Sequence, residues 1–387
     1  MKSSYRELLH QAIEYASASG SFNSLNLIEK SDNFCIWGCG KYFMEAYEKQ
    51  FMSRGYAAKY VVDSNQEKTG KVFFDSVRCI SPEELFRLDN PVVIPLLNNG
   101  RDEVIVELKK HNITWIEPQQ YFFDMQDNGE RSIEWFEKQR TKIFEVYQML
   151  EDDESKRIYA NVICNRIANK NSQIVYKELY SNGQYFNPQS VYAVEKNECF
   201  VDVGAFDGDS IAEFINFVGY NFHSIHAFEL SKKTFEKLEN RVKDFTTDIQ
   251  GKIHCYNYGA WNIDIELPCG EEKTHTGEGC SINKGKNDFL DEDEREVIRC
   301  LPLDQLLYDE PVTLLKMDVE GAEQNALKGC KNIIQEKKPK LAICIYHNVD
   351  DLWEIPIMIK QLVPEYKLFV RHHTKGFGDT VCYAIVD

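Results

Sequence analysis

Residues 200–210 have the sequence FVDVGAFDGDS, in which an apolar run leads into a turn with two glycines. The run has the length and composition of a buried β-strand. Ser210 as a cap, with Glu213 three residues later, has the pattern of a capping box and predicts that a helix follows. A strand, a glycine turn and a helix in this order are typical of α/β folds that bind a ligand against the turn. We therefore expect a ligand site at Gly204, Ala205, Phe206, Gly208 and Ser210.

The charge of this turn indicates which ligand it binds. Asp202, Asp207 and Asp209 all lie in it or beside it. Dinucleotide-binding turns hold a pyrophosphate on backbone amides, and three carboxylates would repel that anion. They fit the sulfonium and the α-amino group of S-adenosylmethionine better, so we favour this cofactor over NAD. In the alternative interpretation, the aspartates only cap helices.

The remainder of the C-terminal part repeats the pattern of strand and helix. Helix-length segments separate strand-like runs at residues 199–203, 224–229, 252–258, 313–319 and 340–346. Two last runs, at 366–371 and 380–386, are joined by a loop that is too short for a parallel crossover, so they must pair antiparallel. A mainly parallel sheet with an antiparallel hairpin at its end is typical of class I methyltransferases.

The next two strand ends fit the nucleoside of such a cofactor. Glu229 ends the second strand 25 residues after Gly204, a spacing that suits an acid hydrogen-bonded to both hydroxyls of a ribose. Alternatively, Glu229 caps the helix that follows Ser231. At the end of the third strand, the small residues and the flat ring of Gly259-Ala260-Trp261 could frame an adenine.

Charged residues collect at the end of the fourth strand, where residues 314–323 read LLKMDVEGAE. Ligands of open α/β sheets bind at this carboxyl edge, so we assign catalytic roles to Lys316 and Asp318. We expect Asp318 to contact the cofactor as well, and Glu320 to contact the substrate. Paired acids here could serve as a base or bind Mg²⁺, although no set of metal ligands is assigned. The alternative is an internal ion-pair group on one side of the strand.

Histidines follow the fifth and sixth strands. His347, with an unperturbed pKa near 6.5, is the best-matched general base for deprotonating a hydroxyl, and we also expect it to contact the substrate. Its alternative role is to cap the next helix or to pair with Asp350. Arg371 and His372 could line the same cleft and attract an anionic or polyhydroxyl acceptor; a solvated loop explains them about as well.

These motifs together resemble the FkbM-type family of S-adenosylmethionine-dependent methyltransferases. The matching segments, in order, are Asp202-Val-Gly204-Ala-Phe-Asp-Gly208, Phe228-Glu229, Pro302-Leu303-Asp304, Lys316-Met-Asp318-Val-Glu320-Gly321-Ala-Glu323 and Leu327-Lys-Gly329. The resemblance implies a class I methyltransferase fold and, usually, O-methylation of sugars or of other small natural-product and glycan hydroxyls. It also implies that Asp202, Gly204, Asp207 and Glu229 contact the cofactor. Phe206 stands where many class I enzymes have a second glycine.

The N-terminal part carries a weaker motif. Residues 32–130 alternate strand-like and helix-like runs, and the turn after residue 36 reads WGCGKYF, a dinucleotide fingerprint that is defective because Phe43 fills the third glycine position. Asp63 lies 25 residues after Gly38, as a ribose-binding acid would. A nucleotide or nucleotide-sugar site is one interpretation of this half. A non-binding scaffold or a homodimerisation module is the other.

Composition excludes several classes of function. The chain of 387 residues has 45 Lys and Arg against 62 Asp and Glu, and a net charge of −17 disfavours nucleic acid as a partner. No secretory signal is visible, and no apolar run approaches the ~20 residues of a membrane span. The twelve cysteines are scattered, many in apolar runs, so we expect reduced, buried thiols in a cytoplasmic protein rather than disulfides or a zinc site.

The sequence therefore predicts an α/β enzyme with a Rossmann-like nucleotide- or sugar-nucleotide-binding domain at residues 1–130, connecting helices at 131–190 and a methyltransferase domain at 191–387. We expect S-adenosylmethionine-dependent O-methylation of a hydroxyl on a sugar, a glycan precursor or a related small molecule. Two alternatives remain at this point: a nicotinamide-dependent sugar-nucleotide oxidoreductase or epimerase, and a non-catalytic nucleotide-binding module. The acidic turn and the terminal hairpin count against the first.

Overall fold

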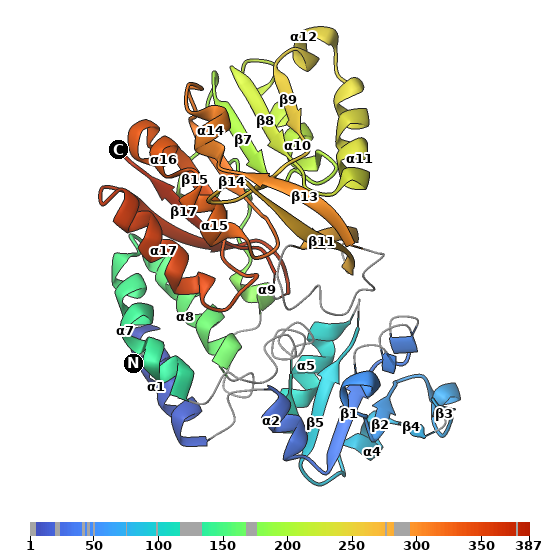
Figure 1. Cartoon of the computed structure of the whole chain (residues 1–387). Coiled ribbons are helices and arrows are strands. Elements are labelled where there is room, and N and C mark those ends of the chain that lie inside the picture. The colour runs from blue at the N-terminus through green and yellow to red at the C-terminus, as the bar shows by residue number, and fades with distance from the viewer. Residues whose placement is uncertain are drawn as a thin grey trace. The chain divides into compact units, whose positions relative to one another are not determined.

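The computed structural model describes residues 5–19, 24–40, 43–44, 47–48, 51–74, 76–97, 100–116, 134–167, 176–274, 277–281, 295–376 and 378–387 (Figure 1). The chain forms two compact units, one of Met1–Thr141 with Ala160–Glu178 and one of Lys142–Tyr159 with Leu179–Asp387. The predicted division into three domains remains a prediction. We describe each unit by itself.

The second unit is built on a seven-stranded sheet. Its strands are β7 (Cys199–Val203), β8 (Ser224–Phe228), β9 (Ile253–Tyr256), β14 (Leu314–Met317), β15 (Lys340–Cys344), β16 (Lys367–His372) and β17 (Thr380–Ile385). They lie in the order β16-β17-β15-β14-β7-β8-β9, and β17 runs antiparallel to both of its neighbours. This arrangement confirms the predicted class I methyltransferase layout with an antiparallel hairpin at its end.

Helices pack against this sheet, and its central strands are buried along their whole length (Figure 1). The helices are α10 (Asp209–Val218), α11 (Lys232–Lys243), α12 (Thr247–Gln250), α14 (Leu303–Leu307), α15 (Glu323–Lys328), α16 (Lys331–Lys337) and α17 (Asp351–Leu362). Phe200, Phe214 and Ile225 belong to one buried cluster, as expected for parallel strands with both faces covered. The predicted capping role of Ser210 is wrong, because α10 begins at Asp209 with Gly208 as its N-cap.

The strand order reverses between β7 and β14, because the chain proceeds from β7 to β8 and β9 on one side and continues from β14 to β15 on the other. Ligands of open α/β sheets bind at the carboxyl ends of strands at such a point. The two strand ends approach so closely that a Cβ on Gly204 would lie 1.8 Å from the carbonyl oxygen of Asp318. With φ at +82° as well, only glycine fits this turn.

A smaller sheet lies between β9 and β14 in the sequence. It contains β10 (Gly259–Ala260), β11 (Ile265–Thr274), β12 (Gly277–Ser281) and β13 (Arg295–Leu301) in the order β10-β13-β11-β12. The strands β11 and β12 form an antiparallel hairpin. Residues 282–294, most of the acidic run before β13, lie outside the described part of the chain.

The first unit has a six-stranded sheet in the order β3-β4-β2-β1-β5-β6. Its strands are β1 (Asn33–Trp37), β2 (Tyr60–Val62), β3 (Val72–Phe73), β4 (Val77–Ile80), β5 (Pro91–Pro95) and β6 (Thr114–Trp115), with α1 (Tyr5–Ser19), α2 (Ser24–Glu29), α4 (Pro82–Leu85) and α5 (Arg101–Lys110) as helices. Short 3-10 turns lie at Met52–Arg54 and Gln66–Lys68. Ser81 and Glu84 form a complete capping box at α4.

Three helices cover most of the predicted connector: α7 (Glu134–Met149), α8 (Asp153–Ile167) and α9 (Tyr176–Leu179). Residues of α7 and of α8 belong to both compact units, since the divisions fall after Thr141 and after Tyr159. Among the described helices, none combines the length and the apolarity that crossing a bilayer requires.

Candidate functional site

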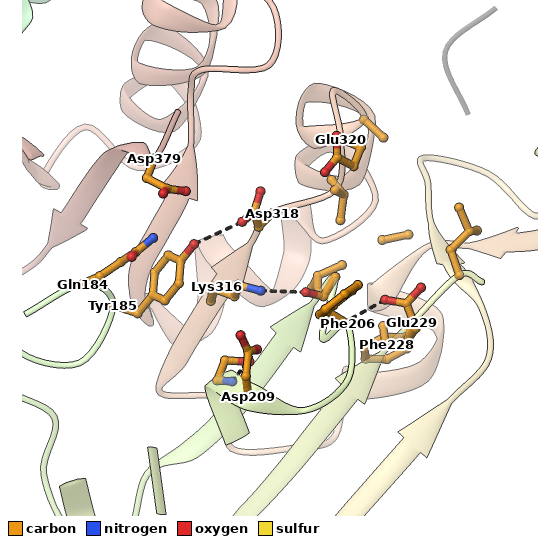
Figure 2. A pocket seen from close by; sticks show the side chains of 18 of the residues that line it. Gln184, Tyr185, Phe206, Asp209, Phe228, Glu229, Lys316, Asp318, Glu320 and Asp379 are labelled. Atoms are coloured by element: carbon orange, nitrogen blue, oxygen red, sulfur yellow. Dashed lines mark hydrogen bonds between the residues drawn. The ribbon is translucent and has the colours of Figure 1, made fainter. Parts of the chain in front are cut away.

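A cavity of about 400 Å³ lies at the point where the strand order reverses. Its size is within the range of small-ligand pockets. Figure 2 shows Glu229 at one side, Asp379 and Gln184 at the other, and Lys316 and Asp318 between them. Nine of the predicted site residues line it: Gly204, Phe206, Ser210, Glu229, Gly259, Ala260, Lys316, Asp318 and Glu320.

Glu229 forms one wall and also holds the glycine turn in place. Its Oε2 accepts a hydrogen bond from the backbone N–H of Phe206 at 2.9 Å (Figure 2). Its Oε1 accepts one from the N–H of Ser231 at 2.8 Å. Burial raises the pKa of this carboxyl from 4.5 to about 7, against the lowering effect of these hydrogen bonds. Each oxygen retains acceptor capacity for a ligand. Ser231 rather than Glu229 is the N-cap of α11, and the contact of Glu229 with a ribose stays a prediction.

A buried ion pair lies beneath the turn. Lys316 Nζ is 2.8 Å from Asp202 Oδ1 and donates a hydrogen bond to the carbonyl oxygen of Gly204 at 2.7 Å. The hydroxyl of Ser210 donates to the other oxygen of Asp202. Burial alone would lower the pKa of Lys316, but the charges of Asp202 and Asp318 raise it, so the amine stays protonated. Lys316 thus forms a buried ion pair, but with Asp202 of the neighbouring strand rather than with the acids of its own strand.

Asp202 does not occupy the position predicted for a direct cofactor contact. Its side chain is fully buried, and within the described chain it is not among the residues that line the cavity. It acts on the cavity only through Lys316, Ser210 and the turn. The reason is that Asp202 lies within the buried strand β7, one residue before the turn opens toward the ligand side.

Four other predicted contacts also lie outside the described cavity lining: Ala205, Asp207, Gly208 and Trp261. Asp207 turns away to pair with Arg241, whose guanidinium lies 2.7 Å from Asp207 Oδ2. Phe206 adopts a left-handed φ of +49° and lines the cavity at the place where a second glycine was expected. The turn therefore presents a ring rather than bare backbone to the ligand.

Asp318 is held at the centre of the cavity wall. The hydroxyl of Tyr185 donates to its Oδ2 at 3.1 Å (Figure 2). The hydroxyl of Tyr346 donates to its Oδ1 at 3.2 Å. Asp379 lines the cavity nearby, where it accepts a hydrogen bond from Gln184. Burial, together with the charge of Asp318, raises the pKa of Asp379 to about 6.

Sequence reasoning missed four of these polar lining residues: Gln184, Tyr185, Tyr346 and Asp379. Tyr346 is adjacent to His347 at the end of the fifth predicted strand, and this position could have identified it. The others lie in irregular segments, before β7 and between β16 and β17, where no periodic pattern marks which side chain faces a ligand.

His347 is buried behind Asp318. Its Nδ1 lies 2.8 Å from Glu323 Oε1, and its Nε2 lies 3.5 Å from Asp318 Oδ1 and 3.7 Å from Glu320 Oε2. Burial would lower the pKa of His347, but the charges of Glu323 and Glu320 outweigh it and raise the pKa to about 10. The expectation of an unperturbed pKa near 6.5 is therefore wrong, because an imidazole that is already protonated cannot accept the proton of a hydroxyl.

Arg371 and His372 do not reach the described cavity lining either. Arg371 is buried, lies 2.6 Å from Asp152 and donates to the hydroxyl of Ser155 at 2.8 Å. His372 is fully buried between Thr380 and the carbonyl of Gly376. Both interpretations of this pair, as substrate contacts and as a solvated loop, are corrected, because the residues lie inside the end of β16.

Asp63 in the first unit is occupied by groups of the protein itself. Its Oδ2 accepts hydrogen bonds from the backbone N–H and the thiol of Cys39 and lies 2.9 Å from Lys68 Nζ. Burial would raise its pKa, but hydrogen bonds from Cys39, Asn65 and Lys68 lower it to about 2. Nucleotide binding by this unit stays a prediction. The carboxylate of Asp63 already contacts Cys39 and Lys68, so a ribose would compete with these groups for it.

The family model of the methyltransferase FkbM domain matches residues 202–372. This part of the chain belongs to the FkbM methyltransferase family. A methyltransferase FkbM from Methylobacillus flagellatus KT is similar in fold over 98% of this chain and 99% of that chain, with 22% sequence identity and a TM-score of 0.72.

More distant solved structures cover half of the chain. Fibrillarin from Aeropyrum pernix, solved in complex with natively bound S-adenosyl-L-methionine, is 11% identical, and the match covers 50% of this chain and 70% of that one with a TM-score of 0.33. A putative rRNA-methylase from Clostridium thermocellum is 10% identical over 50% and 89%, with a TM-score of 0.31. No curated protein matches the chain at a significant level.

The FkbM domain contains most of the cavity but does not complete it. The described lining residues from Val203 to Tyr346 fall inside the matched range. Gln184, Tyr185 and Asp379 lie outside it, on either side. Segments that flank the methyltransferase domain thus contribute polar groups to the same cavity.

Proposed function

We propose that the FkbM methyltransferase domain transfers a methyl group from S-adenosylmethionine to a hydroxyl of a sugar, a glycan precursor or a related small molecule. The observation that carries this proposal is the cavity at the strand reversal, with the carboxylate of Glu229 at the end of β8 and that of Asp318 at the end of β14. The first suits the ribose of the cofactor. The second lies toward the polar side groups Gln184, Tyr346 and Asp379.

The cofactor side of the cavity fits S-adenosylmethionine in shape and charge. Glu229 has acceptor capacity for two ribose hydroxyls, and Gly259 and Ala260 leave room for a flat base beside it. Asp209 and Glu213 add negative charge to the lining near Gly204, as a cationic amino-acid tail requires. When bound, S-adenosylmethionine supplies an electrophilic methyl group on a sulfonium.

The acceptor side is rich in groups that hydrogen-bond to hydroxyls. Tyr185 and Tyr346 fix the carboxylate of Asp318, and Gln184 orients Asp379. Because both tyrosine hydroxyls already donate to Asp318, Asp379 is the carboxylate that we assign as proton acceptor. The acceptor oxygen forms its bond to the methyl carbon, the proton passes to Asp379, and the electron pair of the C–S bond leaves with S-adenosylhomocysteine.

Two of the predicted catalytic residues keep a role in this proposal and one changes. Asp318 positions the acceptor, and Lys316 supports the turn on which the cofactor lies. His347 lies next to Asp318, and we do not assign the predicted proton transfer to it. The acceptor's identity, the ligand of the first unit, homodimerisation and the cytoplasmic location stay predictions.

Calorimetric titration with S-adenosylhomocysteine, and separately with NAD⁺, tests the proposal. We expect saturable binding of S-adenosylhomocysteine that Glu229→Ala abolishes, and no binding of NAD⁺. Glu310→Gln, a change outside the cavity, serves as the control and should leave the affinity unaltered. Binding of NAD⁺ alone would overturn the proposed function.

A further inference from the structure

Three potential metal ligands converge beside the cavity. Asp318 follows β14, Glu323 begins α15, and His347 follows β15; one ligand atom from each lies within 4.8 Å of the others. Because β14 and β15 are adjacent parallel strands, their carboxyl ends bring Asp318 and His347 together across a long stretch of sequence. The proposed methyl transfer leaves Glu323 without a function of its own.

Two buried atoms in this group make no hydrogen bond. They are Nε2 of His347, whose side chain is 7% exposed, and Oε2 of Glu323, whose side chain is fully buried. Buried polar atoms almost always have a partner, so such atoms in one cluster point to a missing ligand. The Nε2 atom faces the carboxylates of Asp318 and Glu320 rather than an apolar surface.

The spacing between Nε2 of His347 and the carboxylates that it faces suits a bound ion. Ligand atoms that each lie about 2.1 Å from a metal are roughly 3 to 4 Å apart from one another. The separations of Nε2 from Asp318 Oδ1 and from Glu320 Oε2 are 3.5 Å and 3.7 Å. They are too long for good hydrogen bonds and fall within this range.

Negative charge exceeds positive charge around the cluster. Three carboxylates, those of Asp318, Glu320 and Glu323, lie between 2.8 and 3.7 Å from the ring nitrogens of His347. A divalent cation would offset this excess.

We propose that Asp318, Glu323 and His347 bind a divalent first-row transition-metal ion, with Glu320 within reach as a further ligand. One imidazole nitrogen among carboxylate oxygens favours Mn²⁺ or a neighbour of similar softness over Mg²⁺ and Ca²⁺, which prefer oxygen alone. Tyr185 and Tyr346, through their hydrogen bonds to Asp318, orient this ligand from outside the coordination sphere.

The consequence for catalysis rests on the proposed function. Asp318 and Glu320 line the cavity, so the open coordination positions of the ion face the acceptor side. An acceptor hydroxyl bound there would be more acidic, and its proton would pass to Asp379 as the oxygen attacks the methyl group. Binding of the metal itself does not depend on this step.

Titration of the chelator-treated full-length protein with MnCl₂, followed by electron paramagnetic resonance and by calorimetry, tests the site. We expect one bound Mn²⁺ per chain, and a loss of affinity of about tenfold or more in His347→Gln and in Asp318→Asn. Circular dichroism and thermal unfolding show that each variant is folded. Glu310→Gln is the matched control, because Glu310 belongs to the other Cys/His/acid group of the described chain, with Cys199 and His223.

The outcomes separate the two proposals. Absence of saturable Mn²⁺ binding, with S-adenosylhomocysteine still bound, would overturn the metal site and leave the proposed function standing; the cluster would then be an ion-pair group around protonated His347. Equal losses in Glu310→Gln would also overturn it. Specific Mn²⁺ binding without any binding of S-adenosylhomocysteine would support the metal site and contradict the proposed function.

Discussion

Lys316 Nζ lies 2.8 Å from Asp202 Oδ1, and both side chains are shielded from solvent beneath the turn that borders the cavity. The pair joins β7 to β14, the two strands between which the order of the sheet reverses. Since Lys316 also donates to the carbonyl of Gly204, the pair sets the position of the turn. Asp202 thus affects the site indirectly, through Lys316 and the turn that Lys316 holds.

Removing one partner of this pair should destabilise the protein. In Asp202→Asn the protonated Lys316 is left buried without its counter-charge, and we expect a loss of about 3 kcal/mol in the free energy of unfolding, measured with denaturant. The double variant Asp202→Asn with Lys316→Met should recover part of it. An unchanged stability with a lost affinity for S-adenosylhomocysteine would show instead that Asp202 contacts the ligand directly.

Gly204→Ala should destabilise the protein far more than the same substitution at another glycine that also has a positive φ but more space around it. The new Cβ would lie 1.8 Å from the carbonyl oxygen of Asp318, so strands β7 and β14 would have to separate. Gly219→Ala is the control, because Gly219 also has a positive φ, of +66°, but no atom within 4 Å of the added Cβ. We expect about 1 kcal/mol for the control and a much larger loss at Gly204, both by thermal unfolding. Equal losses would contradict the close approach.

Affinity for S-adenosylhomocysteine should depend on pH through Glu229. Burial raises the pKa of its carboxyl to about 7, so the group is protonated below that pH and ionised above it. A carboxylate accepts hydrogen bonds from ribose hydroxyls better than the neutral acid does, so affinity should rise between pH 6 and pH 8. Glu229→Gln, which cannot ionise, should weaken binding and flatten this profile, as measured by calorimetry. The same slope in the variant would exclude Glu229 as its source.

Asp379→Asn should separate chemistry from cofactor binding. If Asp379 takes the proton of the acceptor, the variant should lose about a hundredfold in kcat, the lower range for a general base, while the Kd of S-adenosylhomocysteine stays the same. Single-turnover assays with any accepted hydroxyl substrate would measure this. A loss confined to the KM for the acceptor would show that Asp379 binds the substrate without receiving its proton.

Local patterns predicted much of this fold. The apolar run, glycine turn and helix at residues 200–218 depend on contacts between near neighbours. The short connection between β16 and β17 admits only an antiparallel pair, which a count of residues is enough to show. The distance in sequence between Gly204 and Glu229 likewise predicted that Glu229 lies at the ligand site, and Glu229 does line the cavity.

Only the tertiary structure decided what each charged group at the site can do. Glu323 comes 24 residues before His347 in the chain, yet it raises the pKa of His347 to about 10 and removes the predicted base. Likewise, Tyr185 and Asp379 reach the cavity from segments without a periodic pattern. The sequence by itself determined the strands, their turns and the edge of the sheet where the cavity lies, because hydrophobic periodicity and chain geometry act over short distances. Burial and charge act through space between residues far apart in the chain, so the protonation, exposure and pairing of the site residues were decided by the folded structure alone.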